Sequence, residues 1–424
     1  MRKSANPLFQ GEFGLSRRLL VFDGILQNAA AILTMGVFLS GYLVWLDGSD
    51  LLTGIVNSSM NWASIAVLFS FLLFERLKKR KRLLITLTAT ARLLVCGSVF
   101  LPLFIPDKTV VLPIVTGMVI LGNFLSALYS TGFTVWMFGV LPEDKRNEFI
   151  YLRMFWLRMA FTVTTIVGGF VLDAFHKGYT GFLLMFSVSL LLSLTDIFLL
   201  VNVKEPSYVL DETVKPHLGM LAEPMRDSRF RAYLTFVFLF FLVLTMSGTF
   251  TPVYLIRYLK FDYSFISTMN VLQYAALITA TALWRRVEAK KGVVHVFRLT
   301  ASIAVIEFLL YGFLTADRSW MLLPATVLAG IGYSGFNITI LNYRYGILPE
   351  KNRTVYESWY AAVFGLSTLL APVLGNFIMN RLPVVETTLF PHSRFQFMYL
   401  LSFVLVQGVL FAAFRLPKDK RLVR

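Results

Sequence analysis

Long apolar runs separated by short polar stretches dominate the chain. Crossing a membrane core of about 30 Å takes roughly 20 apolar residues in a helix, and twelve runs reach about that length. Because lipid offers no hydrogen-bonding partner to the backbone, each run is expected to be helical. The pattern predicts an all-α polytopic membrane protein with twelve transmembrane helices over residues 19–45, 51–74, 83–104, 110–138, 149–173, 180–202, 230–256, 263–284, 295–315, 320–345, 356–379 and 395–414.

One short polar stretch occurs twice. Residues 139–146 read Gly-Val-Leu-Pro-Glu-Asp-Lys-Arg and residues 346–353 read Gly-Ile-Leu-Pro-Glu-Lys-Asn-Arg, which places Pro142 and Pro349 207 positions apart. A repeat of this length far exceeds the roughly 20 to 50 residues of a solenoid repeat, so it indicates two homologous half-molecules. The longest polar stretch separates the sixth run from the seventh. We expect an N-terminal six-helix half (1–202), a cytoplasmic linker (203–229) and a C-terminal six-helix half (230–424).

Composition and charge fit a membrane protein. With 57% hydrophobic and 15% charged residues, the chain has too little polar surface for a soluble protein of its size. The net charge of +16 does not indicate a nucleic-acid partner, because 27 of the 40 Lys and Arg fall in the termini and alternate loops and only 7 in the other loops. Basic residues accumulate on the cytoplasmic side of membranes. We therefore predict a multi-pass protein of the cell membrane with both termini in the cytoplasm.

Few residues offer chemistry for an enzyme. The single Cys96 excludes an internal disulfide, and the four histidines share no metal-ligand spacing. The sequence has no Gly-x-x-x-x-Gly-Lys-Ser/Thr stretch to bind a nucleotide. We expect that the protein is not an enzyme and that it uses no cofactor and no metal.

The loop after the second run carries a basic motif. Residues 75–80 read Glu-Arg-Leu-Lys-Lys-Arg and resemble the Gly-x-x-x-Asp-Arg-x-Gly-Arg-Arg element of the major facilitator superfamily, although Phe71, Glu75 and Lys78 depart from it. The repeated Leu-Pro-Glu-x-x-Arg is similar to that family's loop after the fourth span, and the six-plus-six arrangement resembles the family throughout. The resemblance implies a central cavity lined by spans 1, 4, 7 and 10, with spans 2, 5, 8 and 11 between the halves.

Polar residues inside the spans are candidates for a substrate pathway. Asp23 and Gln27 share one helix face, and a register that aligns Tyr42 with Tyr254 also aligns Asn61 with Gln273. The alternative is that such side chains only join helices through hydrogen bonds worth about 0.6 kcal/mol each. The pathway candidates are Asp23, Gln27, Asn57, Asn61, Arg158, Gln273, Tyr333 and Asn337.

Charged residues inside apolar runs narrow the choice, because a charge in the membrane needs a partner or a task. Arg92 and Asp196 lie on spans that would be peripheral, and we expect them to pair within the N-terminal half. Asp23 and Glu307 are the candidates for coupling to a proton, since both are titratable groups within a span. The alternative for Asp23 is that it is a solvated carboxylate near the start of its helix, where it complements the helix dipole and has no part in coupling.

Two loop groups are candidates for a cytoplasmic gate. The basic loop after span 2 also fits a binding site for anionic lipid headgroups. In the repeated loops the glutamates could cap the following helix, leaving the arginines free to reach across. The gate candidates are Glu75, Arg76, Arg80, Glu143, Arg146, Glu350 and Arg353.

These features predict a secondary active transporter that moves a small solute by alternating access, coupled to protons, and that works as a monomer. Export of amphipathic compounds and uptake of a polar solute both fit the sequence. The alternatives are a non-transporting membrane receptor or scaffold that kept the helix bundle, and a membrane-embedded enzyme, for which the scattered histidines and single cysteine supply no reactive group.

Overall fold

The computed structural model describes residues 7–74, 77, 79–206, 222–349, 353–385 and 387–412. Within these ranges the chain forms helices and turns and no strand, which confirms the all-α fold. Eleven helices of the described part are long and apolar enough to cross a membrane, and they coincide with eleven of the twelve predicted runs. The contacts divide the chain into unit 1 (Met1–Ser49 and Ala66–His217) and unit 2 (Asp50–Ile65 and Leu218–Arg424).

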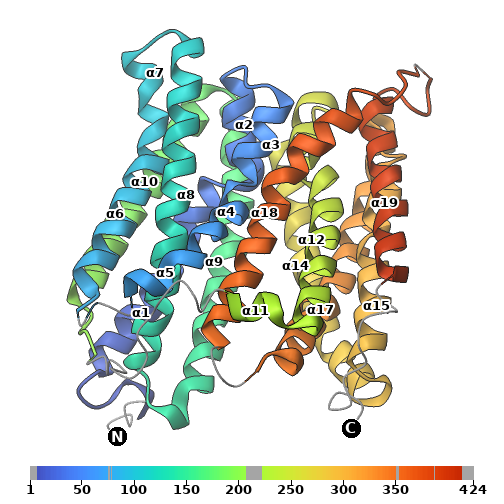
Figure 1. Cartoon of the computed structure of the whole chain (residues 1–424). Coiled ribbons are helices and arrows are strands. Elements are labelled where there is room, and N and C mark those ends of the chain that lie inside the picture. The colour runs from blue at the N-terminus through green and yellow to red at the C-terminus, as the bar shows by residue number, and fades with distance from the viewer. Residues whose placement is uncertain are drawn as a thin grey trace, which may run out of the picture. The chain divides into compact units, whose positions relative to one another are not determined.

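In unit 1, α1 packs against α9 and α10, and α6 packs against α8 and α10 (Figure 1). Trp136 is fully buried in the apolar core, and its indole Nε1 donates a 3.0 Å hydrogen bond to the carbonyl of Lys204. The chain after α10 is thereby fixed to α8. The helices of this unit are α1 (Gly14–Leu33), α2 (Gly36–Trp45), α5 (Val67–Phe74), α6 (Lys81–Gly97), α7 (Leu101–Phe104), α8 (Lys108–Gly139), α9 (Arg146–Ala174) and α10 (Tyr179–Asn202).

In unit 2, α17 packs against α14 and α15, while α12 packs against α18 and α19. Aromatic side chains fill the space between α12 and α17, where the rings of Phe240 and Phe336 stack 5.0 Å apart. The helices of this unit are α3 (Asp50–Asn57), α4 (Ser59–Trp62), α11 (Glu223–Arg226), α12 (Ser228–Gly248), α13 (Thr251–Val253), α14 (Tyr263–Lys291), α15 (Val293–Ala304), α16 (Ile306–Tyr311), α17 (Leu322–Ile347), α18 (Arg353–Met379) and α19 (Ser393–Ala412).

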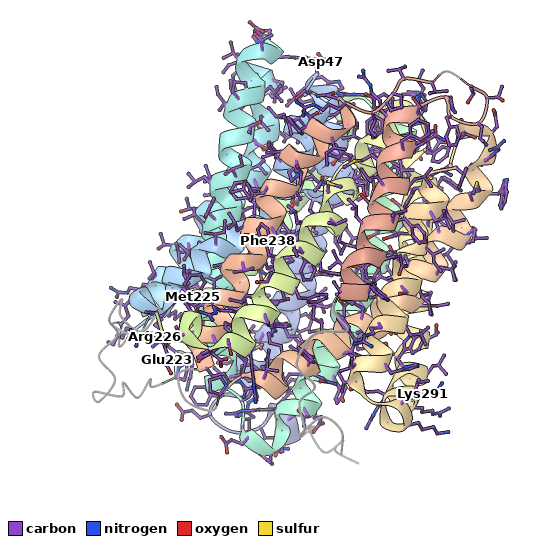
Figure 2. All side chains as sticks on the ribbon, turned by 45° about the vertical axis from the view of Figure 1, so that its right-hand side comes forward. Asp47, Glu223, Met225, Arg226, Phe238 and Lys291 are labelled. Atoms are coloured by element: carbon purple, nitrogen blue, oxygen red, sulfur yellow. The ribbon has the colours of Figure 1, made fainter. Side chains whose placement is uncertain are left out.

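A capped turn starts the first long helix of unit 2. Figure 2 shows Glu223, Met225 and Arg226 on the short helix α11. The carboxylate of Asp227 then accepts hydrogen bonds from the backbone N–H groups of Arg229 (2.9 Å) and Phe230 (3.2 Å). Because these donors have no partner inside the helix, the cap fixes the start of α12 at the end of the predicted linker.

The second predicted span, 51–74, is helical but not continuous. It consists of α3, α4, a 3-10 turn (Ala63–Ala66) and α5. The hydroxyls of Ser58 and Ser59 donate to the carbonyls of Ile55 (3.0 Å) and Val56 (2.6 Å), and the Trp62 indole also donates to Ile55 (3.0 Å). Side chains thus take carbonyls that a continuous helix would use, which accounts for the break.

Two buried tyrosines reflect the internal repeat. In unit 1 the Tyr42 hydroxyl donates to the carbonyl of Ser98 at 3.2 Å, and in unit 2 the Tyr254 hydroxyl donates to the carbonyl of Leu314 at 2.7 Å. Both rings are fully buried. The register that aligns these tyrosines in the sequence therefore also aligns their environments in the two units.

Candidate functional site

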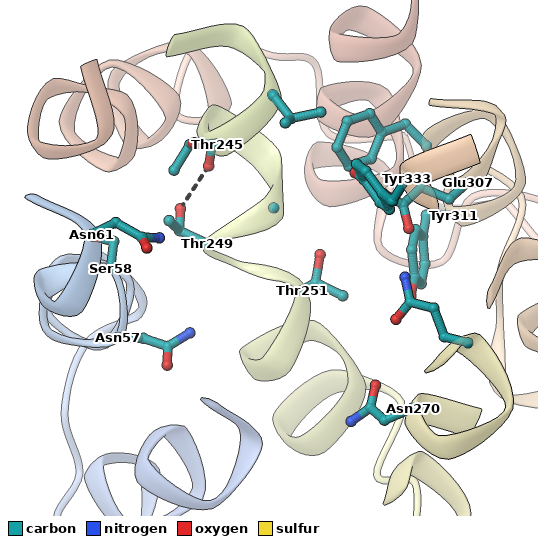
Figure 3. A pocket seen from close by; sticks show the side chains of 14 residues that line it. Asn57, Ser58, Asn61, Thr245, Thr249, Thr251, Asn270, Glu307, Tyr311 and Tyr333 are labelled. Carbon is teal, nitrogen blue, oxygen red and sulfur yellow. Dashed lines mark hydrogen bonds between the residues drawn. The ribbon is translucent and has the colours of Figure 1, made fainter. Parts of the chain in front are cut away.

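A polar pocket of about 350 Å³ lies within unit 2 (Figure 3). Its lining combines amides, hydroxyls and one carboxyl with a few apolar groups. The residues are Asn57, Ser58, Asn61, Leu244, Thr245, Gly248, Thr249, Thr251, Asn270, Gln273, Glu307, Phe308, Tyr311 and Tyr333. Polar side chains of this kind between apolar helices can bind a polar molecule that would not enter the lipid.

The lining residues come from separate elements of unit 2. Figure 3 shows Asn57 and Asn61 on one side of the pocket and Glu307 with Tyr333 on the other. Asn57 ends α3 and Asn61 lies within α4, and both amides reach the same space.

The end of α12 supplies a row of threonines. The Thr249 hydroxyl donates to the carbonyl of Thr245 at 3.1 Å, a bond drawn in Figure 3, and Thr251 accepts a 3.1 Å hydrogen bond from the Tyr399 hydroxyl. α12 ends at Gly248, and the chain continues into the short helix α13 and a π-helical turn (Tyr254–Tyr258). Irregular turns of this kind inside helices are frequent at functional sites.

Glu307 is the carboxyl of the pocket. Its side chain is 9% exposed, and Oε1 accepts a 2.6 Å hydrogen bond from the Tyr333 hydroxyl. No cation among the described residues pairs with Glu307. Because burying an unpaired carboxylate in a membrane protein is costly, Glu307 is suited to take up and release a proton.

A second group of charges lies inside unit 1. Arg153 Nη2 contacts Asp23 Oδ2 at 2.6 Å, and Arg92 pairs with Asp196. Asp23 and Asp196 are both fully buried. Neighbouring Tyr129 is 2% exposed, and its hydroxyl has no hydrogen-bond partner in the described structure. Opposite charges balance one another here, so this group can join helices α1, α6, α9 and α10.

Comparison with known proteins identifies the fold. Residues 233–423 match the model of the Major Facilitator Superfamily. The whole chain also resembles solved structures of that fold: a mutant form of the nucleoside transporter NupG (TM-score 0.73, 13% identity, 95% of this chain and 100% of the other) and a D-xylose-proton symporter (TM-score 0.68, 14%, 96% and 99%). The match over the C-terminal part and these structural likenesses together show the major facilitator fold.

A third solved structure, a peptide transporter POT in complex with sulfate, has a TM-score of 0.69 and 13% identity over 96% of both chains. No curated protein sequence was found to match the chain. At these identities the solved structures indicate a shared fold only. The protein is therefore a multi-pass membrane protein with a major facilitator transporter fold.

Several predicted pathway residues meet in the pocket. Asn57, Asn61, Gln273 and Tyr333 line it, and so does the coupling candidate Glu307. Asn337, one turn beyond Tyr333, is exposed and is not among the lining residues. The structure thus brings together side chains from four predicted spans, while their roles in transport stay a prediction.

Other lining residues were not singled out from the sequence. Ser58 and Asn270 correspond to each other at the offset of 212 that aligns Asn61 with Gln273, so the repeat register contained a signal for both. Tyr311 lies on α16, four positions after Glu307, and shares its helix face.

The other candidates of the N-terminal half, Asp23, Gln27 and Arg158, lie in unit 1. Asp23 pairs with Arg153, which the sequence did not distinguish, whereas the predicted Arg158 is exposed. Gln27 is partly buried and is not among the residues that line the unit 2 pocket. The expected pairing of Arg92 with Asp196 is present.

The described gate candidates contact nearby residues, and the backbone N–H of Arg80 also donates to the carboxylate of Glu205 after α10. Arg80 is 8% exposed and its Nε donates to the carbonyl of Leu77 at 3.2 Å. Arg146 pairs with Glu143 at 3.4 Å, and Arg353 stacks on Tyr345 at 4.3 Å. Glu75, Arg76 and Glu350 lie outside the described residues.

The expected cap by Glu143 is absent from the described start of α9. The N-cap residue is Lys145, which makes no side-chain capping bond, because residues 143–145 form a 3-10 turn ahead of the helix. Arg146 therefore contacts Glu143 within its own loop instead of extending freely.

Proposed function

We propose that this protein is a secondary active transporter of the cell membrane that carries a small polar solute by alternating access and couples it to protons. Glu307 carries the proposal, because it is a buried carboxyl without a cationic partner among the described residues and it faces a polar pocket. In this proposal the pocket of unit 2 is part of the solute site and Glu307 is the proton carrier.

The position of Glu307 supports coupling. A carboxyl that is charged in one state of the cycle and neutral in another must have access to water at some stage and be shielded at another. The polar pocket beside the carboxyl can hold water, and a solute bound there would shield the carboxyl from that water. The Tyr333 hydroxyl can donate to a charged carboxylate and can accept from a protonated one.

The relatives in structure support the same class of function. One of them is a D-xylose-proton symporter and another a nucleoside transporter, and each spans nearly the same length as this chain. These functions belong to the proteins of the solved structures. They make proton-coupled transport of a small solute the first hypothesis to test for this chain.

The pocket favours a polar solute over an amphipathic one. Hydroxyl and amide side chains make up most of its lining. The distribution of basic residues supports an orientation with both termini in the cytoplasm, since 27 Lys and Arg lie in the termini and in alternate loops.

Reconstitution in proteoliposomes tests this proposal. Uptake of a panel of sugars, nucleosides, peptides, lipids and cationic drugs is measured with and without an inward-directed pH gradient. We expect at least one polar solute to accumulate only with the gradient. Accumulation that ignores the gradient would remove proton coupling, and no flux of any solute would favour the receptor or scaffold.

A further inference from the structure

Four amide side chains of the pocket have unused hydrogen-bonding groups. Asn57, Asn61, Asn270 and Gln273 line it, and none of their side-chain amides hydrogen-bonds to another described residue. Each amide carries two N–H donors and one carbonyl oxygen that accepts two bonds. Within a membrane-spanning region such groups need partners that lipid cannot provide. The pocket is therefore suited to a molecule that both donates and accepts.

The charge of the lining argues against an anionic ligand. None of the described residues that line the pocket is Lys, Arg or His. A phosphate or carboxylate would lie in a region of low dielectric without an opposite charge, and next to the carboxyl of Glu307. Phosphorylated and acidic solutes are disfavoured for both reasons.

A cationic ligand fits less well than a neutral one. If Glu307 carries the transported proton, it is neutral at the stage when proton and solute are bound together. A cation would then use only the amide oxygens and leave the N–H groups of all four amides unpaired. A hydroxyl group, in contrast, donates one hydrogen bond and accepts others, which matches both ends of an amide.

The apolar residues and the volume of the pocket limit the size of the ligand. Phe308 and Tyr311 add ring surfaces beside the amides. A pocket of about 350 Å³ lies near the lower end of the range of about 300–1,000 Å³ for small-molecule sites. A single ring with short substituents fits this volume, and an oligosaccharide does not.

We propose that the pocket binds an uncharged solute that carries several hydroxyl groups on a compact ring, the chemistry shared by free monosaccharides, cyclic polyols and nucleosides. This assignment rests on the proposed transport function, because the pocket is taken to be the solute site. The assignment adds the chemical class of the solute to that function. It can be tested separately, because binding can be measured without transport.

Binding to the purified full-length protein separates the classes of ligand. Thermal unfolding is followed with matched neutral and charged compounds: ribose against ribose phosphate, uridine against uridine monophosphate, and glucose against glucosamine. We expect a neutral member to raise the unfolding temperature and its charged counterpart to raise it less. Stabilisation by uridine but not by ribose would identify a nucleoside as the ligand. Stabilisation by ribose or glucose but not by uridine would identify a sugar. A charged member that stabilises more than its neutral partner, or no effect of any neutral compound including myo-inositol, would overturn the proposal.

Amide variants test whether the pocket is the binding site. Asn61→Leu and Gln273→Leu should each weaken binding of the active compound about fivefold to tenfold, the effect of losing about one hydrogen bond. The exposed Asn202, whose amide donates to the carbonyl of Phe198 at 2.8 Å in unit 1, provides the control Asn202→Leu. Unchanged affinity in both pocket variants would place the site elsewhere.

A separate flux measurement distinguishes the two proposals. If the neutral compound binds but does not enter proteoliposomes, the class of ligand holds and the transport function fails. If a charged compound is carried in place of neutral ones, transport holds and the assignment of the solute class fails.

Discussion

The Tyr333 hydroxyl, on α17, donates a 2.6 Å hydrogen bond to the Glu307 carboxyl, on α16, at the edge of the polar pocket. This contact joins a predicted pathway residue to a predicted coupling residue. If Glu307 is the proton carrier, the bond should strengthen when the carboxyl is charged and weaken when it is neutral, since hydrogen bonds to charged groups are about twice as strong.

Removing either partner of this bond should affect transport differently. Glu307→Gln keeps the shape but cannot release a proton, so we expect gradient-driven accumulation to fall to background while exchange of solute across the membrane continues. Tyr333→Phe removes one hydrogen bond to the carboxylate, and we expect a shift of the pH dependence of transport toward higher pH with activity retained. The measurement is flux as a function of pH in proteoliposomes. Normal gradient-driven flux in Glu307→Gln would exclude Glu307 as the carrier.

The buried pair of Asp23 and Arg153 should contribute to stability. Asp23→Asn leaves a buried guanidinium without its carboxylate, for which a loss of about 3–5 kcal/mol in unfolding free energy is expected. Arg153→Met should destabilise less, because a stranded carboxylate can bind a proton whereas a guanidinium stays charged.

Arg158→Gln is the matched control for this pair, since it changes an exposed arginine on the same helix and should alter stability by about 0.5 kcal/mol or less. Unfolding in a mild detergent with added denaturant gives the comparison. Equal stability of Asp23→Asn and Arg158→Gln would contradict a structural role for the pair.

The sequence predicted most of the fold because membrane thickness dictates the length of each span. It also led to Asn61 and Gln273, because the internal repeat gives a register that places both on matching spans. The sequence analysis named Arg158 and not Arg153, although both lie in one apolar run. Five positions rotate a side chain by about 140° around a helix, so only the packing of α9 determines which arginine is buried.

The broken second span was not predictable from hydropathy. The run is apolar enough for a continuous helix, and the interruption depends on hydroxyls of Ser58 and Ser59 bonding to carbonyls of the preceding turn. Ser and Thr make such bonds in many unbroken helices too, so the residue types alone do not indicate a break. The break lies between Asn57 and Asn61, which both line the pocket.

His392 should make stability depend on pH. It lies in the loop before α19, where its ring packs against Tyr254 and Tyr258 at 6.0 and 5.4 Å. Burial lowers its pKa below the usual 6.5, and a hydrogen bond to the backbone of Tyr258 opposes this in part. The unfolded chain thus binds the proton more readily, so this contribution is complete above the unfolded pKa and is lost as the pH falls from there through the folded pKa.

The difference in unfolding temperature between wild type and His392→Gln, measured from neutral to mildly acidic pH, reports the contribution of His392 to stability. We expect this difference to shrink as the pH falls. The exposed His176 serves as a control, and His176→Gln is measured over the same pH range. A constant difference would show that protonation of His392 does not affect folding.

The orientation in the membrane can be tested by labelling. In a Cys96→Ser background, single cysteines at Lys108, Lys177 or Arg318 should react with an impermeant reagent from outside intact cells. A cysteine at Lys290, near the end of α14 beside Lys291 (Figure 2), should react only after the membrane is opened, and the same holds for Lys79. Labelling of Lys79 from outside would overturn the assignment of the termini to the cytoplasm.

Gly330 is expected to set the spacing between α17 and α14. A Cβ atom at this position would lie 2.3 Å from the carbonyl oxygen of Gln273 and 2.9 Å from Cβ of Ala276, which is too close for either to remain in place. Gly330→Ala should therefore push the helices apart, lowering stability by about 1–3 kcal/mol and weakening solute binding through the shift of Gln273.

Gly117 on α8 provides the comparison, because a Cβ atom there would meet nothing within 4 Å. Gly117→Ala should be neutral or stabilising by up to about 1 kcal/mol, since alanine restricts the unfolded chain and favours a helix. Unfolding and solute binding are measured for both variants. If Gly330→Ala behaved like Gly117→Ala in both assays, the close approach of α17 to α14 would not determine the shape of the pocket, and the position of Gln273 would have to be set by other contacts of α14.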